Sequence, residues 1–325
     1  MKKNCILGVL WLFAQVLAAQ EGTSAYQYLK IPVSSHVAAT GGQNISIVDD
    51  DATLGMSNPA LLSNVSDGML SFDYTRYMAG ANLIGAQYVK AFGQRHTGSV
   101  ALHYLGYGSQ METDDQGNEL GSFTPKDIVA QIGYSYLLTD RWSGGAAMKI
   151  LYSHYAGYTS AALAVDVGVN YFNEETDFSF SAVVRDVGVQ VKKFDDRSET
   201  VPYDVQLGLS KGFAHAPIRL SLTLTDLTRW SSSYYYTADG SKTKALQQVF
   251  NHLVVGVDIM PSQYFYLSAG YNFRRAYELK AAGKSRGAGL TFGGGIKVRR
   301  FRADLSYARY HAAASSFTLG VAYAL

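Results

Sequence analysis

Residues 161–171 read Ala-Ala-Leu-Ala-Val-Asp-Val-Gly-Val-Asn-Tyr, with an apolar side chain at every second position. Successive side chains of a β-strand point to opposite faces, so a repeat of two residues is typical of a strand and not of a helix. The polar face of this stretch presents Asp166, Gly168 and Asn170. The sequence therefore predicts a strand with one apolar and one polar face.

The same alternation recurs along the chain and predicts fourteen strands. They lie at 69–77, 83–92, 98–107, 127–138, 142–152, 160–172, 177–189, 203–212, 218–228, 250–260, 263–274, 287–298, 301–310 and 315–325. Outer-membrane barrels have an even number of strands, and each strand needs about 9 to 11 residues to cross the bilayer. Short connections (139–141, 173–176, 213–217, 261–262, 299–300) alternate with longer ones (108–126, 190–202, 229–249, 275–286), as periplasmic turns alternate with outer loops. We predict an all-β fold, a 14-stranded antiparallel transmembrane β-barrel with an N-terminal plug segment.

The composition agrees with this fold and excludes other classes. Of the 325 residues 24 are Tyr, and only 17% are charged, against about 25% in soluble proteins. The single Cys excludes a disulfide scaffold and a cysteine-based metal centre. A soluble β-sandwich or propeller shares the period of two but does not need aromatic residues near the strand ends. The residues expected in two interfacial girdles are Tyr74, Tyr107, Tyr136, Trp142, Tyr152, Tyr171, Tyr203, Tyr271, Phe301, Tyr307 and Tyr323.

Two segments precede the barrel, which we expect at 68–325. Residues 1–19 begin with Lys2 and Lys3, continue with an apolar run and end in small residues, which is typical of a cleaved signal peptide. Without these two lysines the chain has 26 basic and 26 acidic side chains, so charge-driven binding to nucleic acid is not expected. Residues 20–67 are too few for a stable domain, and we expect their apolar side chains to form a plug inside the barrel.

The polar face of the strands supplies the expected lining of the lumen. Its ionisable residues are Asp73, His103, Lys149, Asp166, Arg185, Asp204, Arg219, Asp258, Lys297, Arg302 and Asp304. Five carboxylates and five permanently charged bases balance each other. This balance favours internal ion pairs and a packed lumen over an ion-selective pore.

The plug segment carries a family resemblance. Its marked positions are Gly41, Gly42, Asp49, Asp50, Asp51, Asn58, Pro59 and Ala60. The three acids lack the alternation and the closing Glu of a calcium loop, so a solvated or arginine-paired turn is favoured over a cation site. Placed before fourteen strands, these residues resemble the FadL-type outer-membrane barrels, and they are most similar to the PorV/PorQ branch, which belongs to the type IX secretion system.

The resemblance implies a function in the outer membrane. A barrel of this branch anchors a PorZ-like surface protein within the attachment complex that includes PorU and PorV, which processes secreted cargo and joins it to lipopolysaccharide. The wider FadL superfamily carries apolar molecules through a hatch and a side opening, so an uptake channel for small hydrophobic molecules is the alternative. The final Leu325 departs from the usual terminal Phe of such barrels.

No residue pattern predicts catalysis. The seven histidines form no His-Glu-x-x-His motif, and no Gly-x-Ser-x-Gly elbow stands between a strand and a helix. The run Gly293-Gly294-Gly295 lies within a strand pattern, where it favours tight packing over phosphate binding. We expect a non-enzymatic protein with no catalytic residue, cofactor or metal.

The long loops contain the residues expected to bind a partner. Clustered aromatic residues are common anchors of protein interfaces, although here they are equally compatible with a girdle or a lid over the lumen. A basic loop follows, which could contact lipopolysaccharide phosphates or an acidic partner, and loop 108–126 is acidic. The candidates are Trp230, Tyr234, Tyr235, Tyr236, Arg274, Arg275, Lys280 and Lys284.

Overall fold

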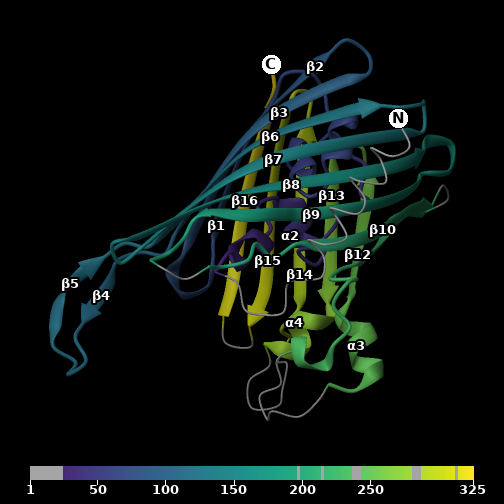
Figure 1. Cartoon of the computed structure of the whole chain (residues 1–325). Coiled ribbons are helices and arrows are strands. Elements are labelled where there is room, and N and C mark those ends of the chain that lie inside the picture. The colour runs from purple at the N-terminus through teal and green to yellow at the C-terminus, as the bar shows by residue number, and fades with distance from the viewer. Residues whose placement is uncertain (1–24, 196–197, 214–215, 236–242, 280–286, 312–313) are drawn as a thin grey trace, which may run out of the picture.

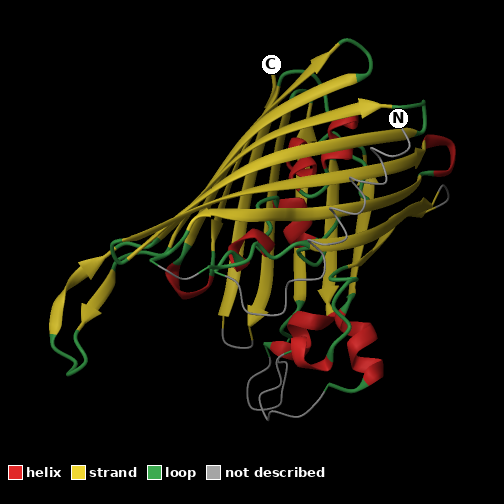
Figure 2. Ribbon diagram, viewed as in Figure 1, coloured by secondary structure: helices red, strands yellow, loops and turns green. Residues whose placement is uncertain are grey.

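Fourteen antiparallel strands close into a barrel (Figures 1 and 2). The computed structural model describes residues 25–195, 198–213, 216–235, 243–279, 287–311 and 314–325. The barrel strands are β1 Met69–Arg76, β2 Asn82–Phe92, β3 His96–Gly106, β6 Lys126–Leu137, β7 Trp142–Tyr155, β8 Tyr158–Asn173, β9 Phe178–Lys192, β10 Asp204–Phe213, β11 Ala216–Leu224, β12 Leu253–Ser262, β13 Phe265–Asn272, β14 Leu290–Val298, β15 Phe301–His311 and β16 Ala314–Ala324. The prediction of fourteen strands is confirmed.

The barrel closes where its first and last strands pair. β1 and β16 run antiparallel, from Met69 opposite Ala324 to Arg76 opposite Phe317. The N-terminal end of β1 and the C-terminal end of β16 therefore lie at the same rim, at the top of Figure 1. The long connections gather at the opposite rim, which we call the outer end, because outer-membrane barrels place short turns on the periplasmic side.

Alternating burial along the strands confirms the two faces. On β8, Leu163 and Val167 are 43% and 47% exposed, whereas Ala164 and Asp166 are 1% and 0% exposed. Of the ionisable residues predicted to face the lumen, eight are buried, and His103, Arg185 and Lys297 are partly buried.

Two of the predicted girdle residues face inward instead. Tyr203 is 5% exposed, and Tyr107 donates a hydrogen bond from its hydroxyl to Asp127 and packs on a buried apolar cluster. Tyr107 follows β3 with the same alternation as Leu105, which is 2% exposed, so the strand pattern itself points it inward. Tyr203 precedes β10 in an outer loop, where the alternation of the strand no longer decides which way a side chain points. The alternation of short and long connections also has exceptions, since the outer connection between β7 and β8 consists of residues 156–157 alone.

The outer loops contain structure of their own. A two-stranded hairpin, β4 Gln110–Thr113 and β5 Glu119–Phe123, projects away from the barrel, and β3 pairs directly with β6 (Figure 1). The helices α3 Ala245–Asn251 and α4 Phe273–Glu278 pack against each other beside the rim. Short 3₁₀ turns lie in the outer loops at η4 Met78–Gly80 and η6 Ser232–Tyr234, and η5 Glu174–Thr176 forms the turn between β8 and β9 at the inner end. None of the described helices is long and apolar enough to cross a membrane.

Residues 25–67 run inside the barrel as four short helical turns. These are η1 Gln27–Lys30, α2 Ser35–Ala39, η2 Ala52–Met56 and η3 Pro59–Asn64. α2 packs against β14 and β15, and η3 packs against β6, β7 and β8. The plug has a small apolar core of its own, formed by Val37, Ile47, Leu54 and Leu61.

Candidate functional site

The plug is capped by its own polar side chains. Ser34 accepts a hydrogen bond from the Val37 amide at the start of α2, and Asn58 does the same for the Ala60 amide at the start of η3. Pro59 takes the first position of η3, where its missing N–H costs no hydrogen bond. The Asn-Pro-Ala sequence therefore begins a helical turn.

Glycines on the inner wall mark where the plug touches the barrel. A Cβ on Gly145 would lie 2.4 Å from the carbonyl carbon of Pro59, and a Cβ on Gly168 would lie 2.2 Å from Asn58 Oδ1. Across the lumen, a Cβ on Gly293 would lie 2.6 Å from the Ala39 Cβ. Any larger side chain at these positions would displace the plug. This finding confirms the close packing predicted for the 293–295 run.

Toward the inner end, ion pairs join the plug to the wall. Arg302 reaches Asp49 at 2.9 Å, Asp51 at 3.3 Å and Asp304 at 2.7 Å, and its side chain is 4% exposed. Lys297 lies 2.9 Å from Asp50. The three successive acids are thus paired with two bases from β14 and β15.

At the outer end, Asp226 joins the plug to the outer loops. Its carboxylate lies 3.2 Å from Lys30 Nζ in η1, 3.2 Å from Arg229 and 2.6 Å from Arg274 in α4. The Tyr234 hydroxyl donates a hydrogen bond to the same carboxylate. Burial alone would raise the pKa of Asp226, but the charges of Lys30, Arg274 and Arg229 outweigh it and lower the pKa to about 2. Asp226 therefore stays ionised and holds three cations together.

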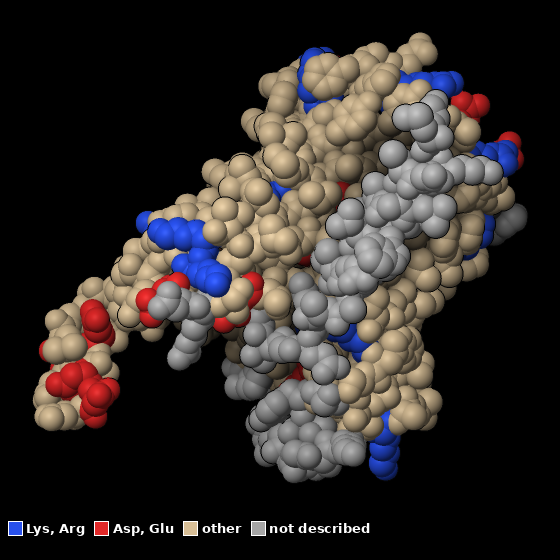
Figure 3. Space-filling view, viewed as in Figure 1, with Lys and Arg blue, Asp and Glu red and all other residues tan. Residues whose placement is uncertain are grey.

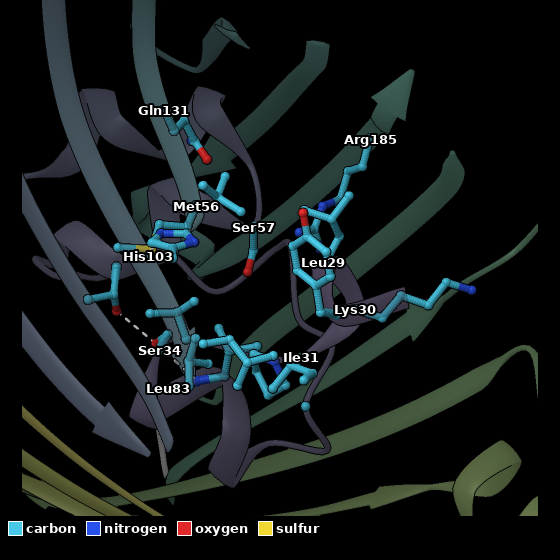
Figure 4. Close-up of a pocket in the computed structure, with 18 of the residues that line it drawn as sticks. Leu29, Lys30, Ile31, Ser34, Met56, Ser57, Leu83, His103, Gln131 and Arg185 are labelled. Atoms are coloured by element: carbon cyan, nitrogen blue, oxygen red, sulfur yellow. Dashed lines mark hydrogen bonds between the residues drawn. The ribbon is translucent and has the colours of Figure 1, made fainter. Parts of the chain in front are cut away.

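A cavity of about 50 Å³ lies beneath η1 in the outer half of the lumen (Figure 4). Plug residues 28–34 form one side, and β2, β3, β6, β7 and β9 form the other. Its apolar lining includes Leu29, Ile31, Val33, Leu83, Leu105 and Val129, and its polar lining includes His103, Gln131, Lys149 and Arg185. The side-chain amide nitrogen and oxygen of Gln131 and the Nε of Arg185 have no hydrogen-bond partner within the described part of the chain.

A second hollow of about 200 Å³ adjoins this cavity at the outer mouth. It is lined by Asp204, Asp226, Arg274, Arg275 and Glu278, and Lys30 and Gln43 line both hollows. The Gln43 side chain donates a hydrogen bond of 3.2 Å to the Lys30 carbonyl. Lys30 and Gln43 thus separate the hollow at the outer mouth from the cavity of about 50 Å³ beneath η1, which we call the inner cavity because it lies deeper in the lumen. A third hollow, of about 210 Å³, opens at the inner end beside Lys297 and Arg302.

The candidate partner-binding residues are mostly engaged within the molecule. Tyr235 is buried and bonded to His252, Tyr234 and Arg274 belong to the Asp226 cluster, and Arg275 lies 4.2 Å from the Tyr310 ring. They hold the outer loops over the plug, as the lid alternative expects. Trp230 stays 50% exposed. Tyr236, Lys280 and Lys284, like the predicted signal peptide, lie outside the described residues.

Neither the Asp226 cluster nor the β4–β5 hairpin was predicted from the sequence. Asp114 builds the hairpin turn, because its carboxylate accepts hydrogen bonds from the amides of Gln116 and Asn118. The acid-containing stretch 112–119 with Gly117 was the available signal for such a turn. Figure 3 shows the acidic residues gathered at the hairpin tip. Among the described residues, no group of three or more His, Cys, Asp or Glu side chains is placed to hold a metal ion.

Comparisons with known proteins establish the fold. No protein-family model matches the chain, and no curated protein matches it. The toluene transporter TodX of Pseudomonas putida superposes with a TM-score of 0.56 at 14% identity, over 90% of this chain and 98% of that one. A FadL homologue of Pseudomonas aeruginosa gives 0.54 at 11% identity over 90% and 98%, and the monoaromatic hydrocarbon channel CymD gives 0.52 at 13% over 92% and 98%. The chain therefore has the fold of FadL-like outer-membrane barrels, which supports an outer-membrane location.

Proposed function

We propose that this protein is an outer-membrane channel that admits a small molecule with an apolar body past its N-terminal plug. The carrying observation is the pair of hollows that meet at Lys30 and Gln43, the inner of which is lined by apolar side chains from plug and wall. The likeness in fold to TodX and CymD supports this function, since both are described as carrying aromatic hydrocarbons.

The lining suggests an amphipathic cargo. The outer mouth is polar and charged, and the inner cavity places Gln131 and Arg185 beside six aliphatic side chains. A pure hydrocarbon would leave these polar groups unpaired, which costs free energy. A molecule with an apolar body and one polar group would satisfy both parts of the lining.

Passage requires the plug to move. The inner cavity of about 50 Å³ is smaller than the cavity of about 150 Å³ that takes up a benzene molecule. η1 is the element that separates the cavity from the mouth, and it is held by the Lys30–Asp226 ion pair and by a hydrogen bond of 2.6 Å between the hydroxyls of Tyr26 and Ser160. Opening therefore means displacing η1 from the outer loops.

Uptake of toluene and p-cresol tests this function in cells whose lipopolysaccharide slows the passive entry of apolar molecules. The natural chain should raise the uptake rate above that of cells without it, and the increase should be larger for p-cresol than for toluene. Ile31→Trp, which fills the cavity, should abolish the increase. Val169→Trp on the lipid-facing side of β8 is the matched control and should preserve it. Equal uptake with the natural chain and the Ile31→Trp variant would overturn the proposal.

The projecting hairpin favours a second function, the anchoring of a surface protein. Residues 107–125 contain four carboxylates and no Lys or Arg. Met111 and Leu120 on this hairpin are 61% and 65% exposed. A hairpin of two strands alone is only marginally stable in water, so this one would gain most from a partner with a basic surface. By the resemblance to the type IX secretion barrels, we propose that such a partner would be a PorZ-like protein beside PorU and PorV.

Affinity purification from solubilised outer membrane tests the anchor. The natural chain should recover a surface protein in a one-to-one ratio, and the triple variant Glu112→Lys, Asp115→Lys, Glu119→Lys should lose it. Asp114 is left unchanged in this variant so that the hairpin turn stays intact. Glu174→Lys with Glu175→Lys reverses exposed acids at the inner end and serves as the control. If the natural chain recovers no extracellular protein, the anchor function is excluded.

A further inference from the structure

The outer helix α3 exposes its apolar side chains and partly buries its polar ones. Leu246, Val249 and Phe250 are 70%, 54% and 39% exposed, and their spacing puts them on one face. The two glutamines of the helix are half-buried, and Gln247 donates a hydrogen bond to the buried Asn251. None of the seven residues of α3 is charged. A surface helix in water normally shows the opposite arrangement.

The apolar face of α3 continues the lipid-facing surface of the barrel. Phe250 stacks on Phe273 at 5.3 Å, and Phe273 packs edge to face on Tyr271 at 4.8 Å. Tyr271 stands at the outer end of β13 on the same face as Leu267, which is 46% exposed and points to lipid. A chain of aromatic contacts thus leads from the outer end of β13 to α3.

The strand β13, which leads into the contact with α3, is too short to cover the membrane alone. β13 has eight residues, which at about 3.3 Å per residue and a tilt of about 40° rise by only about 20 Å. The apolar band of an outer-membrane barrel is about 25 Å tall. β8 on the other side of the barrel has sixteen residues and needs no such extension. The apolar face of α3 supplies the missing height above β13.

We propose that α3 lies in the outer leaflet of the membrane, with Leu246, Val249 and Phe250 against lipid acyl chains. The helix then completes the lipid-facing band beyond the outer end of β13. Trp230 is half-exposed, and its ring lies 4.1 Å from the ring of His252, the residue that follows α3. In this placement Trp230 lies at the polar edge of the same band, where indole rings are favoured. This placement is independent of whether the barrel conducts a solute.

Spin labels at single cysteines test the placement, because Cys5 is the only cysteine of the chain and can be replaced by Ser. The label is placed at Val249→Cys, at Leu267→Cys as the lipid-facing reference and at Leu120→Cys as the water-facing reference. Each full-length variant is reconstituted into phosphatidylcholine vesicles, and its folding is verified by heat-modifiable gel mobility. Accessibility to oxygen and to a water-soluble nickel chelate is then measured by electron paramagnetic resonance.

The label at 249 should give an oxygen-to-nickel accessibility ratio within about twofold of that at 267, because a helix in the leaflet meets oxygen and excludes the chelate. A ratio like that at 120 would place α3 in water and overturn the proposal. Low accessibility to both reagents would mean that protein covers this face, which would overturn it as well.

Discussion

Lys30 Nζ lies 3.2 Å from Asp226 Oδ1, although 196 positions of the chain separate the two residues. Lys30 ends η1 of the plug, and Asp226 is the second residue of the loop that follows β11. The plug is therefore tied to the outer loops by a charge pair and not by apolar packing alone. A contact of this kind can be released without unfolding the barrel.

Removing this pair should open the channel more often. Lys30→Met deletes one partly exposed ion pair, which is worth about 1 kcal/mol, and so should raise the open fraction about fivefold. Conductance across a planar bilayer measures the effect. Lys90→Met removes the exposed Lys90–Asp67 pair at the inner end and should leave the conductance unchanged. Identical conductance for the two variants would contradict the proposal that the Lys30–Asp226 ion pair holds the plug closed.

Acid should have the same effect as the mutation. The folded protein holds the pKa of Asp226 at about 2, below its ordinary value of 3.8, because the charges of Lys30, Arg274 and Arg229 outweigh burial. The ionised carboxylate therefore contributes its full stabilisation above about pH 4, and this contribution is lost as the pH falls toward 2. We expect the conductance of the natural chain to rise as the pH falls from about 4 to about 2. The conductance of Asp226→Asn should stay constant over the same interval. A flat profile in the natural chain would show that Asp226 does not hold the plug.

The barrel could be predicted from the sequence because its signal is local. Each strand shows its two faces within ten residues, as 161–171 does, and every predicted strand is present. The outer loops were harder to interpret, since α3 and the β4–β5 hairpin interrupt segments that lack a sustained period. The spacing of Leu246, Val249 and Phe250 was a usable helix signal, but it does not say which face meets the protein.

Glycine at the plug contacts should be required for tight seating of the plug. Gly145→Ala would bring a Cβ within 2.4 Å of Pro59, and such overpacking costs about 1 to 3 kcal/mol. Gly144→Ala is the matched control, because its Cβ would meet only the Leu138 side chain at an ordinary 3.6 Å. The urea midpoint of unfolding in lipid vesicles should fall for Gly145→Ala and stay nearly constant for Gly144→Ala. Equal midpoints would mean that the plug adjusts freely.

The candidate site could be predicted only in part. The inward charges follow from the strand period, and the pairing of the 49–51 acids was one of two alternatives. The partners could not be assigned, because Arg302 lies some 250 positions from Asp49 in the chain and many acids and bases share the lumen. Tyr234 and Tyr235 were prominent in the sequence, yet composition cannot distinguish a tyrosine that binds a partner from one that closes a lid.

The buried Arg302 should contribute far more to stability than its neighbour Lys297. Arg302→Met leaves the carboxylates of Asp49, Asp51 and Asp304 without their common cation, and breaking such a buried pair costs about 3 to 5 kcal/mol. Lys297→Met removes a side chain that is 38% exposed and pairs only with Asp50, so the cost should stay below about 1 kcal/mol. Free energies of unfolding from urea titration in vesicles measure both. If the two variants lose similar stability, the inner ion pairs act as solvated surface charges, and the plug is held by packing alone.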